Sequence, residues 1–130
     1  MARRTLAAAP LLLLVALGPG CGHRPGPERG QASWYGKAYR GKPTASGDPF
    51  RPSKRTAAHK TLPLGTVVKV TRTDTRQTVR VVINDRGPYV SGRIIDLSRK
   101  AARRIDMVQQ GVAPVVVKVV GCKKRYGDCR

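Results

Sequence analysis

Short runs of β-branched residues, separated by polar turn residues, dominate the hydrophobic pattern in the second half of the chain. Three of these runs predict strong strands, at residues 66–71, 78–84 and 115–120. The polar sequence Asp-Thr-Arg lies between the first two runs, so we expect them to pair as a hairpin. Shorter strands are predicted at residues 32–35 and 93–97, each with a glycine close by.

One short helix interrupts this β pattern. Ser98 can cap its N-terminus, and the apolar side chains that follow share one face: Ala101, Ala102 and Ile105. Basic side chains occupy the opposite face: Arg99, Lys100, Arg103 and Arg104. Several strands with one short helix in so short a segment predict an all-β fold closed into a small barrel, which leaves no sheet edge exposed.

The N-terminal segment is expected to direct export rather than to join the fold. Two arginines precede an apolar run at residues 6–17, which is too short to span a bilayer as a helix. Cys21 follows the small residues Gly-Pro-Gly, as the lipidated cysteine of a bacterial lipoprotein would, although Gly18 stands where that pattern usually has leucine. We therefore interpret residues 1–20 as a lipoprotein-type signal peptide and Cys21 as a candidate site for a membrane anchor.

Composition then divides the remaining chain into three parts. Residues 22–30 contain three glycines and two prolines but no apolar residue, which predicts a flexible linker. The folded unit is expected at residues 31–121, followed by a basic tail at 122–130. Cys122 and Cys129 in this tail favour a disulfide in an oxidising compartment, whereas a metal site would need further ligands and neither histidine lies nearby in sequence.

Length and charge exclude several classes of protein. A chain of 130 residues leaves no room for a barrel of eight βα units or for a dinucleotide-binding domain beside a substrate domain. The 26 Lys and Arg residues against 7 Asp and Glu residues give a net charge of +19, which by itself suggests nucleic acid. Export argues against that partner, and the basic residues are not interleaved with a row of aromatic ones. A wall polymer rich in carboxylates and phosphates is the better match.

The carboxylates limit any acid/base chemistry to a short list. Four are expected at the surface, in the linker, a turn, the end of the helix and the tail: Glu28, Asp74, Asp106 and Asp128. Asp85 ends an apolar strand, and Asp96 lies within an apolar segment, where desolvation would raise its pKa as a general acid requires. Both also have a structural interpretation, because Asp96 could bond the amides of the Ser98 helix and Asp85 those of its own turn.

His59 and the aromatic residues are open to two interpretations. A lone histidine is more often a structural hydrogen-bonding group than a catalyst. Trp34, Tyr35 and Tyr89 suit either the core or a groove in which aromatic rings stack on sugars. Their sequence positions alone do not separate these roles.

Five motifs in order give the chain a clear family resemblance. They are ASWYG (32–36), TASGDPF (44–50), TAAHKTLPLGT (56–66), INDRGPY (83–89) and GRIIDLS (92–98). Together they resemble the RlpA family, the rare lipoprotein A type of endolytic lytic transglycosylase. The resemblance implies a six-stranded double-psi β-barrel related to expansins, with cleavage of peptidoglycan glycan strands, especially those that lack stem peptides.

The resemblance also implies roles for individual residues. Asp96 corresponds to the catalytic acid of related barrels, Asp85 to a companion in the groove, and His59 to a histidine implicated in activity. Asp48 replaces the usual glutamate as a shorter carboxylate that could keep the role, so these four residues are the expected catalytic set. The expected substrate-binding set is Trp34, Tyr35, Arg86 and Tyr89.

Two departures from the family pattern bear on function. Arg51 stands where family members commonly carry an aspartate implicated in activity, which reverses a charge in the expected groove. The SPOR domain that many members carry after the barrel is not expected here, since the sequence ends nine residues after Gly121. Arg51 therefore keeps open the alternative of an expansin-like module that binds glycan without cutting it.

The sequence therefore predicts a lytic transglycosylase. Asp96 would protonate the bond between N-acetylmuramic acid and N-acetylglucosamine, and the muramic C6 hydroxyl would attack to leave a 1,6-anhydro end. Because the nucleophile belongs to the substrate, one carboxyl group can act first as acid and then as base. No metal or organic cofactor is implied. We expect a lipid-anchored monomer in the bacterial envelope, facing the periplasm from the cell membrane or the outer membrane.

Overall fold

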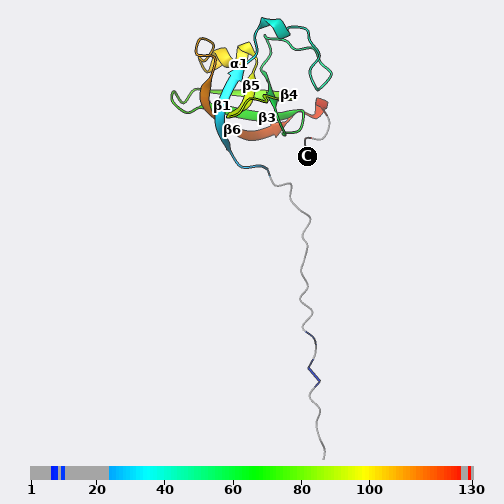
Figure 1. Cartoon of the computed structure of the whole chain (residues 1–130). Helices are drawn as coiled ribbons and strands as arrows, with labels where there is room; N and C mark the ends of the chain where they lie inside the picture. The colour runs from blue at the N-terminus through cyan, green and yellow to red at the C-terminus, as the bar shows by residue number, and fades with distance from the viewer. Residues whose placement is uncertain (1–6, 9, 11–23, 127–128, 130) are drawn as a thin grey trace, which may run out of the picture.

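Six strands form the structure of this protein, a computed structural model that describes residues 7, 8, 10, 24–126 and 129. The strands are β1 (Glu28–Trp34), β2 (Thr56–His59), β3 (Thr66–Arg72), β4 (Thr78–Asp85), β5 (Arg93–Leu97) and β6 (Ala113–Cys122). A helix, α1 (Arg99–Arg104), and two short 3-10 helices, η1 (Lys37–Tyr39) and η2 (Lys124–Tyr126), complete the described elements. Figure 1 shows α1 at the top of the barrel, whereas β1 begins at the bottom.

The strands close into a barrel in the order β1-β5-β2-β4-β3-β6. Two of the neighbouring pairs, β1 with β5 and β2 with β4, are parallel, and the other four are antiparallel. Both parallel pairs contain a register shift, after Gln31 in β1 and after Ala57 in β2. The all-β class and the six-stranded barrel expected from the resemblance are confirmed.

Alternation along the strands separates the interior of the barrel from its outer face. Fully buried side chains of β3, β4 and β5 point inward, among them Val68, Val70, Ile83, Ile95 and Leu97. The apolar face of α1 joins the same cluster. Because Ser98 caps this helix by accepting a bond from the amide of Ala101, the predicted cap is confirmed.

Arg72 connects α1 to the hairpin of β3 and β4. Its side chain is buried at the end of β3, and its Nη1 donates to the carbonyl oxygens of Ile105 and Asp106, at 3.1 and 2.7 Å. Its Nε also donates to the Asp74 carboxylate at 2.8 Å, which lowers the pKa of Asp74. A single buried cation therefore satisfies the carbonyls that follow the helix.

The sequence predictions differ from the structure at the start of the barrel. β1 begins at Glu28, so the last three residues of the predicted linker, 28–30, pair with β6. Glu28 is exposed, as expected, but it begins this strand instead of lying in a linker. β2 carries only small and polar residues and was not predicted. The predicted signal peptide lies almost entirely outside the described residues, and Cys21 lies outside them too.

The C-terminal segment packs against the loop before β3. A disulfide joins Cys122 to Cys129. Gly65, at a φ of +93°, lies directly beneath this segment, and a Cβ atom there would approach the Tyr126 side chain to 2.7 Å. In the described part of the chain, no helix is both long and apolar enough to cross a membrane.

Candidate active site

Four residues form one row across the outer face of the barrel. The register pairs Ser33 of β1 with Asp96 of β5, Asp96 with Ala58 of β2, and Ala58 with Asp85 of β4. Directly paired residues share a face of the sheet, so both carboxylates point to the same side, with the small Ala58 between them. The strands thus bring together residues that lie far apart in sequence, and the row is the candidate active site.

Asp96 has the environment that a general acid needs. It is partly buried, and the only hydrogen bond it accepts from the described residues comes from Ser33 Oγ to Oδ1, at 3.0 Å. Burial raises the pKa of Asp96 and nearby Asp85 raises it further, whereas the Ser33 hydroxyl and Arg93 lower it, and the net direction is upward. The interpretation of Asp96 as a helix cap is wrong, because Ser98 fills that role.

Asp85 is held by backbone amides. Its Oδ1 accepts from Ala45 N at 3.0 Å and from Arg86 N at 2.9 Å. The first bond fixes the loop that crosses from η1, and the second fixes the turn after β4. Asp85 therefore does what the structural interpretation predicted, while its position in the row still places a second carboxylate on the same face as Asp96.

Tyr35 covers the row from the end of β1. Its ring stacks on Phe50 with the centroids 4.5 Å apart and meets Tyr39 edge-on at 5.7 Å. The buried hydroxyl has no hydrogen-bond partner among the described residues. Burial raises the pKa of Tyr35, and the charges of Asp85 and Asp96 raise it further, which places this neutral donor near both carboxylates. An unpaired buried hydroxyl is unusual and marks this position as a special feature of the site.

His59 lies on the other face of β2. Its register partner is Ile95, whose side chain is fully buried in the barrel, whereas the preceding residue, Ala58, faces the row. His59 Nδ1 accepts from the amides of Thr61 and Leu62, at 3.1 and 3.0 Å, and Nε2 lies 2.7 Å from Glu28 Oε2. His59 therefore lies outside the row, and its ring holds the loop after β2 and the start of β1, while its expected part in activity stays a prediction.

The four residues expected to bind substrate do not all lie near the row. Trp34 packs against the core, and its indole Nε1 donates to the Val108 carbonyl at 3.2 Å, so its side chain is not on the face of Ser33. Arg86 donates from Nη1 to the carbonyls of His59 and Leu62. Tyr89 is 78% exposed on the loop after β4. Of this set, Tyr35 lies beside the row and Tyr89 is free to approach a ligand.

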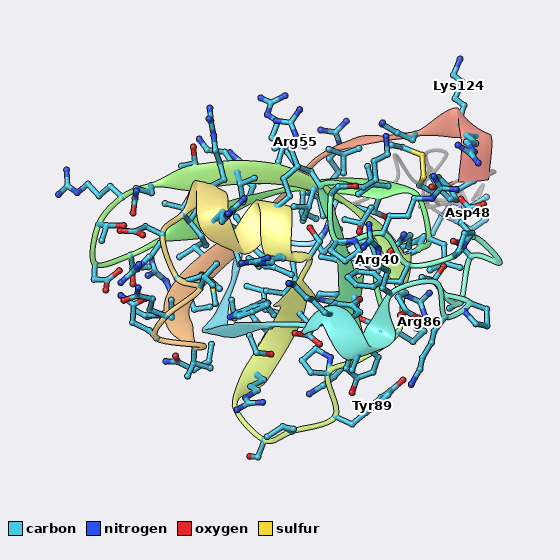
Figure 2. The ribbon with its side chains drawn as sticks, turned by 90° about the horizontal axis from the view of Figure 1, so that it is seen from above. Arg40, Asp48, Arg55, Arg86, Tyr89 and Lys124 are labelled. Carbon is cyan, nitrogen blue, oxygen red and sulfur yellow. A yellow bond between two sulfur atoms is a disulfide. The ribbon has the colours of Figure 1, made fainter. Side chains whose placement is uncertain are left out.

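Asp48 lies away from the row, beside the C-terminal segment (Figure 2). Its Oδ2 accepts from the Tyr126 hydroxyl at 3.1 Å, and Arg125 is 3.4 Å from its Oδ1. Asp48 and Arg51 both line a cavity of about 620 Å³ between the loop before β2 and η2. The expectation that Asp48 joins Asp96 is not supported by this geometry, because both of its oxygens face cationic or hydroxyl partners.

Sequence reasoning missed two residues of this region. Ser33 acts directly on Asp96, but a serine in a short strand carries no signal of that contact. Asn84 lines the same cavity as Asp48, and its buried Oδ1 has no hydrogen-bond partner among the described residues. Asn84 follows a largely apolar stretch of β4, and a polar amide at such a position is a signal that was available in the sequence.

Comparisons with known proteins agree with this architecture. The sequence profile of a family described as lytic transglycolase matches residues 27–117. The endolytic peptidoglycan transglycosylase RlpA of Campylobacter jejuni is 51% identical over 92 residues, which cover 71% of this chain and 34% of that protein. The protein of the same name from Helicobacter pylori strain J99 is 55% identical over 92 residues, covering 71% and 29%. The chain thus spans about a third of the length of these relatives.

Solved structures show the fold alone. A Streptomyces papain inhibitor superposes with a TM-score of 0.61 at 24% identity, covering 75% of this chain and 97% of its own. A point mutant of a Clavibacter michiganensis expansin, in complex with cellohexaose, superposes with a TM-score of 0.59 at 21% identity, covering 73% and 50%. Because an inhibitor and an expansin share this barrel, the fold does not fix the function.

Proposed function

Since this chain belongs to the lytic transglycolase family, we propose that it cleaves peptidoglycan glycan strands between N-acetylmuramic acid and N-acetylglucosamine. The row that places Asp96 beside Ser33, with a raised pKa, supports this proposal most directly. The two relatives named above carry endolytic peptidoglycan transglycosylase in their names. The reaction leaves a 1,6-anhydro end, and strands without stem peptides are the preferred substrate.

The mechanism uses one carboxyl group twice. Protonated Asp96 donates its proton to the glycosidic oxygen as the bond to the muramic anomeric carbon breaks, and the N-acetylglucosamine alcohol leaves. The muramic C6 hydroxyl then attacks the positively charged anomeric carbon and gives its proton to the Asp96 carboxylate. Atoms and charge balance without water, and Asp96 returns to its starting state. Asp85, on the same face of the sheet as Asp96, orients the sugar and stabilises the developing charge.

The cellular setting belongs to the same proposal. The N-terminal segment directs export, and a lipid on Cys21 anchors the domain to a bacterial envelope membrane on its periplasmic side. The protein acts as a monomer. Globomycin, an inhibitor of lipoprotein signal processing, should leave a larger precursor in cells, and Cys21→Ala should remove incorporated labelled palmitate; an unlabelled native protein would contradict the anchor.

Digestion of purified, peptide-stripped sacculi tests the cleavage. The native chain should release fragments with anhydro ends, detected by mass spectrometry, and Asp96→Asn should reduce their release by at least about a hundredfold, as loss of a general acid does. Asp106→Asn is the matched control, since it removes an exposed carboxylate elsewhere on the barrel. Equal release by the native chain and Asp96→Asn would rule out Asp96 as the acid.

An expansin-like module that binds glycan without cutting it is the second candidate. It is favoured by the surroundings of Asp48, where Arg51 and Arg125 line the same cavity as the carboxylate. Such a module would be retained on sacculi and would release no anhydro ends. Arg51→Asp separates the two cases, because it restores the negative charge usual at this position in the family. If the variant released anhydro ends and the native chain released none, the native chain would belong to the binding class.

A further inference from the structure

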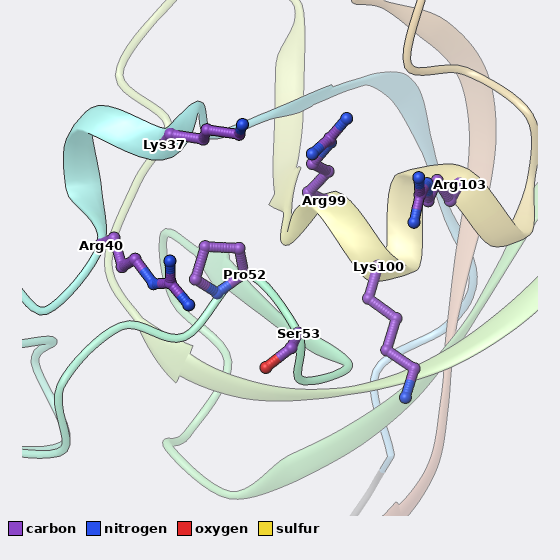
Figure 3. A pocket seen from close by; sticks show the side chains of 7 residues that line it. All are labelled: Lys37, Arg40, Pro52, Ser53, Arg99, Lys100 and Arg103. Atoms are coloured by element: carbon purple, nitrogen blue, oxygen red, sulfur yellow. The ribbon is translucent and has the colours of Figure 1, made fainter.

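A basic cavity of about 460 Å³ lies between η1 and α1 (Figure 3). Lys37 and Arg40 enter it from η1 and the residue that ends it, Pro52 and Ser53 from the following loop, and three cations from α1: Arg99, Lys100 and Arg103. Five cationic side chains from two separate segments of the chain thus line one hollow. The candidate active site uses none of them.

Among the described residues, these five cations have no partner of opposite charge. No ion pair found in the described part of the chain includes any of them, and no carboxylate lines the cavity. Like charges gathered in a concave surface repel one another, and the walls focus their potential into the hollow. The arrangement therefore favours an anion strongly over a neutral ligand.

Backbone hydrogen bonds fix the segments that carry the cations. The amide of Arg40 donates to the Lys37 carbonyl at 3.0 Å, and the amide of Lys100 donates to the Pro52 carbonyl at 3.0 Å. The second bond ties α1 directly to the loop on the opposite wall. Because the backbone positions are set before any ligand arrives, binding need order only the side chains.

The basic lining continues beyond this cavity. Ser53 and Lys100 also line the cavity of about 620 Å³ that contains Asp48. Five more cations line that second cavity: Arg51, Lys54, Arg55, Lys123 and Arg125. The two cavities share a wall, so the positive surface extends from η1 past α1 to η2. An extended path of this kind suits a chain of anionic groups better than one isolated ion.

We propose that the two adjoining cavities bind a polymer of repeated phosphate groups that carries no bases, such as a polyol phosphate. Arginine forks pair with phosphate oxygens in a bidentate manner, and closely spaced phosphates supply several negative charges to one hollow. Among the described residues, no aromatic side chain lines the first cavity, so bases would have nothing on which to stack there; the one aromatic residue of the second, Tyr126, donates its hydroxyl to Asp48. A concave lining can enclose a polymer strand, whereas a lipid surface would contact side chains that protrude from the protein.

Binding of a fluorescently labelled glycerol phosphate oligomer to the full chain tests this proposal. Fluorescence anisotropy should show saturable binding that weakens as salt increases, because the ligand releases counterions. The triple variant Arg40→Gln/Arg99→Gln/Arg103→Gln should bind roughly tenfold more weakly, as expected for three solvent-exposed charge contacts. Because no glycan is present, the result is independent of the proposed cleavage.

A control variant distinguishes binding at a defined site from attraction by the net charge alone. Lys69, Arg80 and Lys118 are exposed register neighbours on β3, β4 and β6, and none of them lines either cavity. Changing all three to Gln removes the same charge and should leave the affinity within about twofold of the native value. An equal loss in both variants, or no loss in the cavity variant, would overturn the proposal.

Competition identifies the source of the phosphate. Unlabelled oligomer should displace the probe more effectively than phosphatidylglycerol vesicles at equal phosphate concentration. Single-stranded DNA of the same number of phosphates should compete no better than the oligomer, since the first cavity offers its bases no stacking. Stronger competition by the vesicles or by the DNA would assign the surface to a lipid or to a nucleic acid and reject the polymer. Circular dichroism verifies that each variant is folded.

Discussion

At Asp96, burial and the nearby carboxylate of Asp85 raise the pKa, whereas the hydroxyl of Ser33 lowers it. The carboxyl group is partly buried beside Asp85, and Ser33 donates a hydrogen bond to it. A raised pKa keeps the acid protonated closer to neutral pH, where it can give its proton to a leaving group. Burial and the nearby carboxylate also lower the stability of the folded state, because they disfavour the charged form of Asp96.

Ser33→Ala tests how the pKa of Asp96 is set. Because the Ser33 hydroxyl lowers this pKa, its removal should raise the pKa, and the alkaline limb of kcat/KM on peptide-free glycan should move to higher pH. Ser33→Thr keeps the hydroxyl and should keep the native pH profile. An unshifted profile for Ser33→Ala would mean that another group is responsible for the alkaline limb.

Asp96→Asn should stabilise the fold although it removes the acid. The folded pKa lies above the unfolded one, so the folded state binds more protons and the native chain loses stability as pH rises between the two values. At pH 7 the amide should therefore raise Tm by roughly 2–4 °C, the equivalent of about 0.5 kcal/mol for a domain of this size. The gain should disappear below the unfolded pKa, and a gain of the same size at every pH would contradict this origin.

At the scale of single elements, the loop after β2 depends on one histidine. His59 accepts two amide hydrogen bonds from this loop and contacts Glu28 at the start of β1. It therefore joins three segments of the chain in a site that is almost closed to solvent. These contacts give His59 a structural role that requires no contact to substrate.

His59→Ala should lower the free energy of unfolding by about 1–3 kcal/mol, since two partly buried amides lose their acceptor. His59→Asn should recover part of this loss, because a side-chain carbonyl can accept bonds near the position of Nδ1. Urea denaturation measures both. If His59→Ala instead removed cleavage and left stability unchanged, His59 would have a direct catalytic role.

The link from α1 to the β3–β4 hairpin depends on Arg72 in a comparable way. Arg72→Met keeps most of the buried side-chain volume but leaves the carbonyls of Ile105 and Asp106 without their donor. The free energy of unfolding should fall by about 2 kcal/mol or more. Arg76→Met, at an exposed turn position, is the control and should change it by less than about 0.5 kcal/mol.

Sequence patterns identified most elements, for physical reasons that differ from one to the next. β3 and β4 were predicted because β-branched residues fill both strands and a polar turn joins them. The helix was predicted from Ser98 and the apolar face behind it. β2 was missed because Thr-Ala-Ala-His has little β propensity of its own; pairing with both β4 and β5 holds it as a strand.

The site was only partly accessible to the same reasoning. Asp96 and Asp85 were identified from carboxylates in or beside apolar segments, a local pattern. Which face of a strand a residue occupies depends on register, and the shift after Ala57 could not be read from the sequence. For this reason His59 and Trp34 were placed with the carboxylates although the strands turn them to the other side.

For the whole molecule, charge governs association. A net charge of +19 favours association with anionic polymers before any specific contact forms. Raising the ionic strength from about 0.05 to about 0.5 M should increase KM for peptide-free glycan by roughly tenfold, while kcat stays nearly constant, because screening weakens ground state and transition state alike. A fall in kcat with an unchanged KM would place the salt-sensitive step in the chemistry instead.

The parallel pairing of β1 with β5 also affects when the contact between Ser33 and Asp96 forms during folding. Ser33 and Asp96 are 63 residues apart in sequence, and β1 is flanked on its other side by β6, near the end of the fold. Contacts of such long range form late, because a large loop must close before they are made. The contact between Ser33 and Asp96 is therefore expected to form together with the closed barrel, rather than as an early local contact.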